Sequence, residues 1–138
     1  MHIIGLDPGF TGALACLDAA GALVSLDDTP VLRLSTGKTA YDVPGMAALL
    51  RPYAQYIGAH VVLEQAQGMP GQGITSTFST GHGYGLWQGI LVALALPYTL
   101  IRPAIWKRNL GLTKEVGIVR GRVYFPMSLT LAGGCRLG

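Results

Sequence analysis

Short apolar runs divided by Gly, Pro and Asp make up the first 28 residues. The run 2–7 ends in Asp7 and is followed by Pro8-Gly9, which predicts a buried strand that ends in a turn. Two more apolar runs, 11–17 and 22–26, are separated by Asp18-Ala-Ala-Gly21, a sequence typical of a hairpin turn. We therefore expect three consecutive strands paired in antiparallel fashion.

A helix is expected after these strands. The polar segment 29–41 has little periodicity and predicts a loop. Asp42 suits an N-cap, and Pro44 suits the first turn that follows it. Apolar residues then recur at helical spacing as far as Ile57, and Gly58 ends the helix. The residues at this helical spacing are Met46, Leu49, Leu50, Tyr53 and Ile57.

The second half of the chain alternates strands with helices. An apolar strand, 60–64, ends in Glu64, and a Gly-rich loop follows it. Together the two halves predict one α/β domain over residues 1–138, a mixed sheet with helices packed on it. The remaining elements expected are a long helix over 75–94, a strand over 97–101, a helical turn over 103–109 and a last helix over 114–124 capped by Thr113.

Composition and charge limit the classes of protein to which the chain can belong. With 50% hydrophobic and only 12% charged residues, the chain is not intrinsically disordered. Residues 1–106 carry a net charge of −2 and residues 107–138 a net charge of +5. This asymmetry indicates a polyanionic partner, and a solvated helix face explains it about equally well.

The cysteine spacing indicates no disulfide framework, and we expect no signal peptide. Cys16 and Cys135 match no metal-binding or secreted-scaffold spacing, which favours a reducing compartment. The N-terminus lacks the pattern of a signal peptide. The apolar stretch 85–100 is too short and too interrupted for a membrane span. We expect a cytoplasmic protein, in a bacterium or a phage-infected host, with no membrane partner.

Two acids stand out among the seven in the chain. Asp7 and Glu64 each end an apolar strand and each precede a loop that contains Gly and Pro. In open α/β sheets, such strand ends converge on a shared crevice. Two converging carboxylates repel each other unless a cation lies between them, and Mg²⁺ is the usual cation. The competing explanation is that both acids only cap their loops.

The turn after the first strand, Asp7-Pro-Gly9-Phe-Thr11-Gly12, adds a second signal. Its glycines permit close backbone approach, and Thr11 offers a hydroxyl to a phosphate. A lone D-x-G-x-T motif fits polynucleotide nucleases and actin-like or sugar-kinase-like ATP-binding domains equally well. The chain is short for the two lobes that such an ATP-binding protein closes over a nucleotide.

Five motifs in order resemble the RuvC-type Holliday junction resolvases, particularly the phage-encoded branch, within the ribonuclease H-like fold. They cover about residues 1–126. They are Gly5-Leu-Asp7-Pro-Gly9-Phe-Thr-Gly12-Ala, Val61-Val-Leu-Glu64, Gln67-Gly-Met-Pro70-Gly71-Gln72-Gly73, Phe78 with Gly83-Tyr84-Gly85-Leu86-Trp87, and Pro97-Tyr98 with Pro103-Ala-Ile-Trp106-Lys107.

The resemblance implies a ribonuclease H-like fold with a five-stranded mixed sheet. It also implies that the chain is a metal-dependent endonuclease. Such an enzyme acts as a homodimer on four-way DNA junctions. By resemblance, Asp7 and Glu64 are metal ligands for Mg²⁺, with Mn²⁺ as an alternative ion. The resemblance also places Lys107, Arg108 and Lys114 on DNA phosphates and Phe78 against a base at the crossover. A solvated surface explains the lysines about as well, and a core position explains Phe78 about as well.

The glycine-rich helix and two histidines are further candidates for a function. The Gly-rich face 81–89, with Leu86 and Leu91, is the candidate dimer surface. A phosphate or metal contact by His82 is less favoured than a position on the helix surface, and His60 is expected to be structural.

The resemblance fades at about Leu131, where a last helix with acidic or His ligands is expected. Residues 116–138 contain no Asp, Glu or His. We therefore expect this last helix to be shortened or missing. Either catalysis is impaired and the chain binds junctions without cutting them, or another element supplies the missing ligand.

Overall fold

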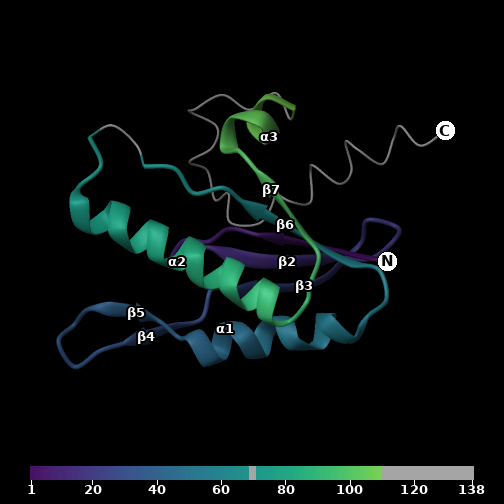
Figure 1. The fold of residues 1–138 in the computed structure, drawn as a ribbon, viewed down its shortest axis with the longest axis horizontal. Helices are drawn as coiled ribbons and strands as arrows, with labels where there is room; N and C mark the ends of the chain where they lie inside the picture. The colour runs from purple at the N-terminus through teal and green to yellow at the C-terminus, as the bar shows by residue number, and fades with distance from the viewer. Residues whose placement is uncertain (69–70, 110–138) are drawn as a thin grey trace.

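The computed structural model describes residues 1–68 and 71–109. Its centre is a five-stranded sheet in the order β3-β2-β1-β6-β7. Strands β1 (His2–Leu6), β2 (Ala13–Leu17) and β3 (Leu23–Asp28) pair antiparallel, whereas β6 (Ala59–Glu64) and β7 (Tyr98–Ile101) run parallel to β1. The expected mixed sheet with helices packed on it is confirmed (Figure 1).

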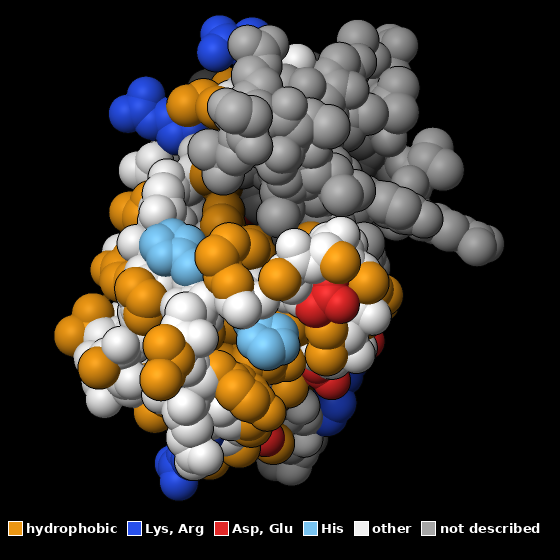
Figure 2. Space-filling view, turned by 90° about the vertical axis from the view of Figure 1, so that its right-hand side faces the viewer, with side chains coloured by type: hydrophobic (Ala, Val, Ile, Leu, Met, Phe, Trp, Pro, Cys, Tyr) orange, Lys and Arg blue, Asp and Glu red, His pale blue; other side chains and the backbone are white. Residues whose placement is uncertain are grey.

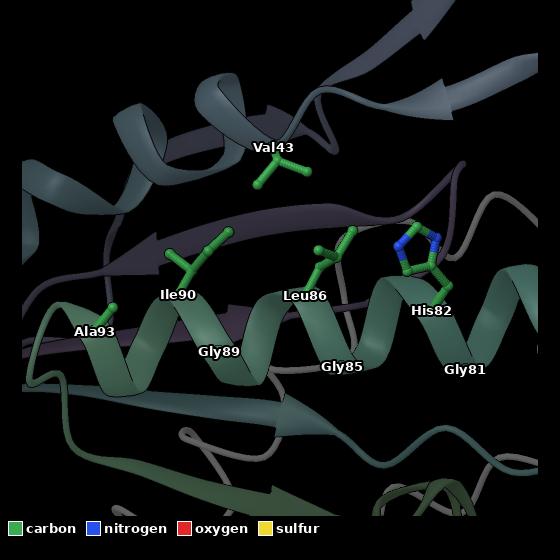
Figure 3. Close-up of a pocket in the computed structure, with 8 residues that line it drawn as sticks. All are labelled: Val43, Gly81, His82, Gly85, Leu86, Gly89, Ile90 and Ala93. Carbon is green, nitrogen blue, oxygen red and sulfur yellow. The ribbon is translucent and has the colours of Figure 1, made fainter.

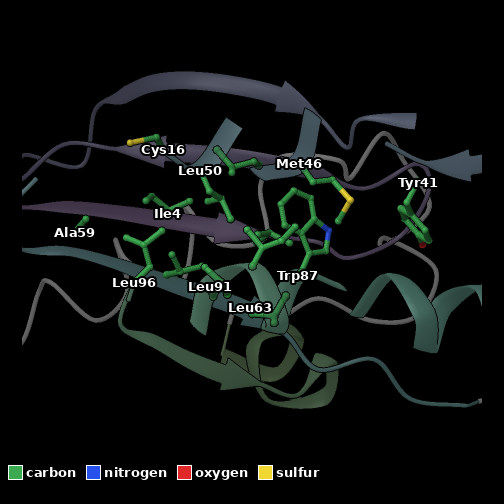
Figure 4. Packing of buried hydrophobic residues seen from close by; sticks show 14 residues of the cluster. Ile4, Cys16, Tyr41, Met46, Leu50, Ala59, Leu63, Trp87, Leu91 and Leu96 are labelled. Carbon is green, nitrogen blue, oxygen red and sulfur yellow. The ribbon is translucent and has the colours of Figure 1, made fainter. Parts of the chain in front are cut away.

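Helices α1 (Val43–Leu50) and α2 (Ile74–Ala93) cover one face of this sheet, while α3 (Pro103–Asn109) follows β7. Apolar residues alternate along the strands, so that Ile4, Leu6, Val61 and Leu63 all lie on the face that packs against these two helices. Figure 4 shows how Trp87 of α2 lies among them. The core therefore sits between the sheet and the pair α1 and α2.

The first helix is shorter than its apolar pattern predicts. Asp42 caps α1 by accepting a hydrogen bond from Gly45 N at 3.1 Å, as expected. The α-helix ends at Leu50 and continues as a 3₁₀ helix, η1 (Arg51–Gln55), because Pro52 has no N–H to donate to an α-helical ladder. Ile57 is therefore outside the helix and fully exposed, so the expected end of the helix at about Ile57 was wrong.

The segment 29–41, expected to be a loop, forms a two-stranded hairpin. Strands β4 (Val31–Arg33) and β5 (Thr39–Tyr41) pair antiparallel, separately from the main sheet. The hairpin extends beyond the sheet at the end where α2 begins (Figure 1). No helix among the described residues is long and apolar enough to cross a membrane. The helix expected over 114–124 lies outside the described residues.

Gly83 controls how closely α2 approaches the sheet. A Cβ at this position would lie 2.7 Å from Pro8 O and would collide with the ring of Tyr41. Gly81 lies on the same helix, but a Cβ there would meet no described atom within 4 Å. The two glycines therefore differ in what the fold requires of them.

We expect Gly83→Ala to lower the free energy of unfolding by roughly 1–3 kcal/mol, because the added methyl group overpacks the contact between α2 and Pro8. Gly81→Ala is the matched control. It should be neutral or stabilising by up to about 1 kcal/mol, because Ala favours a helix more than Gly does. Urea unfolding followed by circular dichroism measures both. Equal effects of the two substitutions would contradict the close approach at Gly83.

Candidate functional site

Asp7 sits in a tight turn immediately after β1. Its backbone N–H donates to Ala13 O at 3.0 Å, and its Oδ1 accepts a hydrogen bond from Gly9 N at 3.2 Å. Gly12 N donates in turn to Gly9 O at 2.9 Å. A Cβ on Gly12 would lie 2.9 Å from Gly9 N and would collide with Asp7 O, so this turn requires glycine there. The exposed Thr11 lies at the tip of the same turn.

Glu64 lies beside Asp7 at the same edge of the sheet. Strands β1 and β6 are parallel, and Leu6 is the register partner of Leu63, so the next residues on each strand are neighbours. Adjacent strands are about 4.8 Å apart. The alternating burial of β6 places Glu64 on the sheet face opposite Leu63 and therefore away from the α1 and α2 core. The structure thus brings the two predicted carboxylates together.

The environment of Glu64 disfavours its charge. Burial and, to a smaller extent, the negative charge of Asp7 raise the pKa of this carboxyl, the ammonium of Lys107 lowers it in part, and the resulting pKa is about 7. The Glu64 carboxyl is therefore about half protonated near neutral pH. A cation held between the two carboxylates would replace this proton.

The basic residues expected near the site lie on α3. Lys107 is partly buried, and its Nζ lies 5.3 Å from the ring centroid of Trp106, a cation–π contact. Lys107 also lowers the pKa of Glu64, so its ammonium lies close enough to this carboxyl for the two charges to interact. Arg108 is exposed. Lys114 lies outside the described residues.

Phe78 is a surface residue. Its side chain is 72% exposed on α2, which excludes the alternative of a core position. The first nine residues of α2, 74–82, include no buried residue, and Gly73 gives the helix no side-chain cap. Hydroxyls of Thr77, Ser79 and Thr80 each donate to the carbonyl four residues earlier. This half of α2 therefore extends past the sheet and carries an exposed aromatic ring.

A series of ring contacts joins Phe78 to the turn after β1. The ring centroids of Phe78 and His82 are 5.9 Å apart, and those of His82 and Tyr41 are 5.8 Å apart. The Tyr41 ring stacks on Phe10 at 4.2 Å. The exposed His82 is therefore packed between two aromatic rings on the helix surface, which agrees with the favoured expectation for it.

Tyr41 is a positioning residue that the sequence analysis missed. Its buried Oη lies 3.3 Å from Pro8 O and 3.2 Å from Ser79 O, so this hydroxyl bridges the Asp7 turn and α2. Burial, together with the charge of Asp7, raises the pKa of Tyr41 and keeps it protonated as a donor. A signal existed in the sequence. Tyr41 precedes the N-cap Asp42, and Met46 lies at the position where a hydrophobic staple places its partner.

A groove of about 460 Å³ runs along the glycine-rich face of α2. Figure 3 shows Leu86 and Ile90 of α2 and Val43 of α1 lining it. A Cβ on Gly81, Gly85 or Gly89 would meet no described atom within 4 Å. Leu91, expected on this surface, is instead fully buried in the core, because it lies on the opposite side of the helix beside Trp87.

The remaining candidates do not add metal ligands. His60 Nε2 lies 2.9 Å from Thr99 Oγ1 on the neighbouring strand. Among residues 1–68 and 71–109, no group of three or more His, Cys, Asp or Glu side chains could hold a metal ion. Within this part of the chain, the candidate metal ligands that lie together are the carboxylates of Asp7 and Glu64. Glu115 and Cys135 lie outside it.

Figure 2 shows the side of the molecule where β1 begins, away from the carboxylates. Hydrophobic side chains cover much of this face, and the Lys and Arg side chains drawn in colour lie around its edges. The basic residues of the described chain are therefore not gathered at this end of the sheet.

The mixed five-stranded sheet with helices packed on it matches the ribonuclease H-like fold of RuvC. The structure of T. thermophilus RuvC in complex with a Holliday junction substrate matches with a TM-score of 0.62 and 14% identity, covering 100% of this chain and 96% of that chain. A second Thermus thermophilus RuvC structure matches with a TM-score of 0.51 and 18% identity, covering 96% and 90%. The RuvC resemblance predicted from the sequence is confirmed for the fold. No protein-family model matches the sequence, and no curated protein matches it.

We expect Glu64→Gln to raise the free energy of unfolding at pH 8 without added metal, by on the order of 1–3 kcal/mol. The unfolded carboxyl loses its proton near pH 4.5 and the folded one near pH 7. Between these values the folded state binds more protons, so stability of the parent falls as pH rises. Gln carries no such charge.

Urea unfolding at pH 4 and at pH 8 measures the effect. The gain should vanish at pH 4, where Glu64 is protonated in both states. Asp27→Asn, which removes a carboxylate from the edge strand β3, is the control and should give no comparable gain at pH 8. A gain of the same size at both pH values would show that charge burial at Glu64 is not the cause.

Proposed function

We propose that the chain is a divalent-metal-dependent endonuclease that resolves four-way DNA junctions, in recombination or in phage DNA processing. One observation carries the proposal. Asp7 and Glu64 are neighbours at the carboxyl edge of a sheet whose fold is that of RuvC. One of the matching RuvC structures contains a Holliday junction substrate, which supports branched DNA as the substrate class.

The chemistry of the donor set fits Mg²⁺, with Mn²⁺ as the alternative ion. Asp7 and Glu64 supply hard carboxylate oxygens, and Mg²⁺ is usually held by one or two carboxylates with water and phosphate oxygens. When bound, the ion supplies activation of a water molecule and stabilisation of charge on the phosphate. The turn at Gly9 and Gly12 holds the Asp7 backbone in place, and Lys107 adds positive charge beside Glu64.

The DNA contacts follow from exposure and charge. Lys107 and Arg108 provide cations on α3 for phosphates close to the carboxylates, and such contacts are salt-dependent and independent of sequence. The hydroxyl of Thr11 is exposed in the Asp7 turn and is available to a phosphate oxygen. The exposed ring of Phe78 provides a surface on which an unpaired base at the crossover stacks.

A homodimer is part of the proposal, because a four-way junction presents two equivalent strands to be cut. The groove along α2 supports it. Gly81, Gly85 and Gly89 leave open space that no described atom of the chain fills, although Gly weakens a helix by about 1 kcal/mol relative to Ala. The second copy of α2 can approach closely along this face.

A second candidate function is junction binding without cleavage. It is supported by the donor set, because the described residues bring together two carboxylates and no third His, Cys, Asp or Glu ligand. The fold, the cations of α3 and the exposed Phe78 would serve binding equally well without chemistry.

We expect the parent protein to cut a synthetic four-way junction in Mg²⁺ or Mn²⁺, and Asp7→Asn to cut it roughly 10²-fold or more slowly. Asn retains the Oδ1 that accepts the hydrogen bond from Gly9 N, so the turn should persist. Gel assays of cleavage and of band shift measure the two activities separately. Binding without cleavage by the parent would favour the second candidate, and an Asp7→Asn protein that cuts as fast as the parent would contradict the nuclease.

We expect Gly85→Leu to convert a dimer to a monomer, because the added side chain fills the groove where the second helix would lie. Sedimentation velocity measures the change. Thr75→Leu adds a side chain of similar size to an exposed position in the first turn of the same helix, away from the groove, and should leave the dimer intact. A parent protein that is monomeric in the presence of junction DNA would overturn the dimer.

A further inference from the structure

The hairpin formed by β4 and β5 is exposed in β4 and at its tip, and it is anchored at its base. All eight residues 31–38 are exposed. At the base, Thr29 N donates to Gly12 O at 2.9 Å, and Asp42 N donates to Pro30 O at 3.0 Å. Tyr41 at the end of β5 bridges Pro8 O and Ser79 O. The hairpin is therefore tied to the Asp7 turn and to α2, while its tip reaches into solvent.

The charged side chains of the hairpin are all positive. Residues 31–41 include Arg33 and Lys38 and no acidic residue. Arg33 Nη1 donates to Thr39 Oγ1 at 3.2 Å, which uses one of the five N–H groups of the guanidinium. The nearest acid along the chain, Asp42, is the N-cap of α1 at the base of the hairpin, and Asp27 and Asp28 lie at the end of β3. Its strands carry the tip roughly 10–13 Å from the base, at about 3.3 Å per residue.

The topology places this hairpin opposite α3 across the candidate site. Strands β3 and β7 form the two edges of the sheet, and both run parallel to β1. The chain leaves β3 into the hairpin and leaves β7 into α3, so both elements start from the sheet edge that carries Asp7 and Glu64. Both elements therefore carry cations beyond the end of the sheet where Asp7 and Glu64 lie, with Arg33 and Lys38 at the β3 edge and Arg102, Lys107 and Arg108 at the β7 edge.

The span between the two groups matches a stretch of DNA. Four intervals of about 4.8 Å make the sheet about 19 Å wide. At about 3.4 Å per nucleotide along each strand, this width corresponds to roughly five to six base pairs. DNA that contacts Lys107 at one edge of the sheet therefore reaches the hairpin within half a turn of duplex.

We propose that the β4–β5 hairpin is a second phosphate-contacting element, which binds a DNA arm on the side of the candidate site away from Lys107. This inference rests on the proposed junction binding and assigns it a contact surface. Arg33 and Lys38 contact the phosphates, and the rigid base of the hairpin fixes their position relative to Asp7.

The test measures how binding depends on salt. The probe is a fluorescently labelled synthetic four-way DNA junction in metal-free buffer, with affinity measured by anisotropy over a series of salt concentrations. Two lost phosphate contacts reduce the slope of log K against log salt by about 1.8. We expect this change in the double variant Arg33→Ala/Lys38→Ala, with a loss of affinity of up to about 60-fold at 0.1 M salt that disappears near 1 M.

Arg51→Ala is the matched control, because Arg51 is an exposed cation at the far end of α1 from the hairpin. It should leave the slope unchanged. Circular dichroism checks that the double variant folds, as its exposed positions lead us to expect. A slope equal to that of the parent would overturn the hairpin contact alone. A parent protein that fails to bind the junction would overturn the proposed function and, with it, this contact.

Discussion

The parallel pairing of β1 with β6 is the constraint on which the candidate site depends. Its register makes Asp7 and Glu64 adjacent on one face of the sheet. At a separation of about 5 Å and an effective dielectric constant of about 20, two such charges repel each other by roughly 3 kcal/mol. The fold holds them there because the apolar residues behind them, Leu6 and Leu63, are fully buried and cannot shift register without exposing the core.

Several neighbouring features compensate for this repulsion or hold the carboxylates in spite of it. Near neutral pH about half of the Glu64 carboxyls are protonated, which reduces the negative charge at the site. The positive charge of Lys107 offsets part of the remaining negative charge. The Asp7 side chain accepts a hydrogen bond from the turn, and the hydroxyl of Tyr41 ties that turn to α2. Two carboxylates that are held close together, and whose negative charge is only partly neutralised, are suitable ligands for a divalent cation.

The sequence predicted the parts of the fold that depend on local pattern. Apolar runs ending in Asp7 and Glu64 identified two central strands and placed both acids at the same edge of the sheet, and the fold that the motifs implied is confirmed. The hairpin was missed because β4 is exposed on both faces, so no alternation marks it, and the anchor of β5 through Tyr41 joins segments more than 30 residues apart. Leu91 was misplaced because α2 has apolar residues on several faces, and only the packing of Trp87 decides which face is inside.

The construction of α2 has a thermodynamic consequence for recognition. Its second half is fixed by Trp87 and Leu91, but residues 74–82 have no buried side chain and no side-chain cap, and hydroxyls that bond back to the helix carbonyls weaken it further. This half is therefore the less stable part of the helix. Stacking a base on Phe78 would draw the helix toward its fully formed state. The measured enthalpy and entropy of binding to nucleic acid would then include the enthalpy gain and the entropy loss of helix formation, in addition to those of the contact itself.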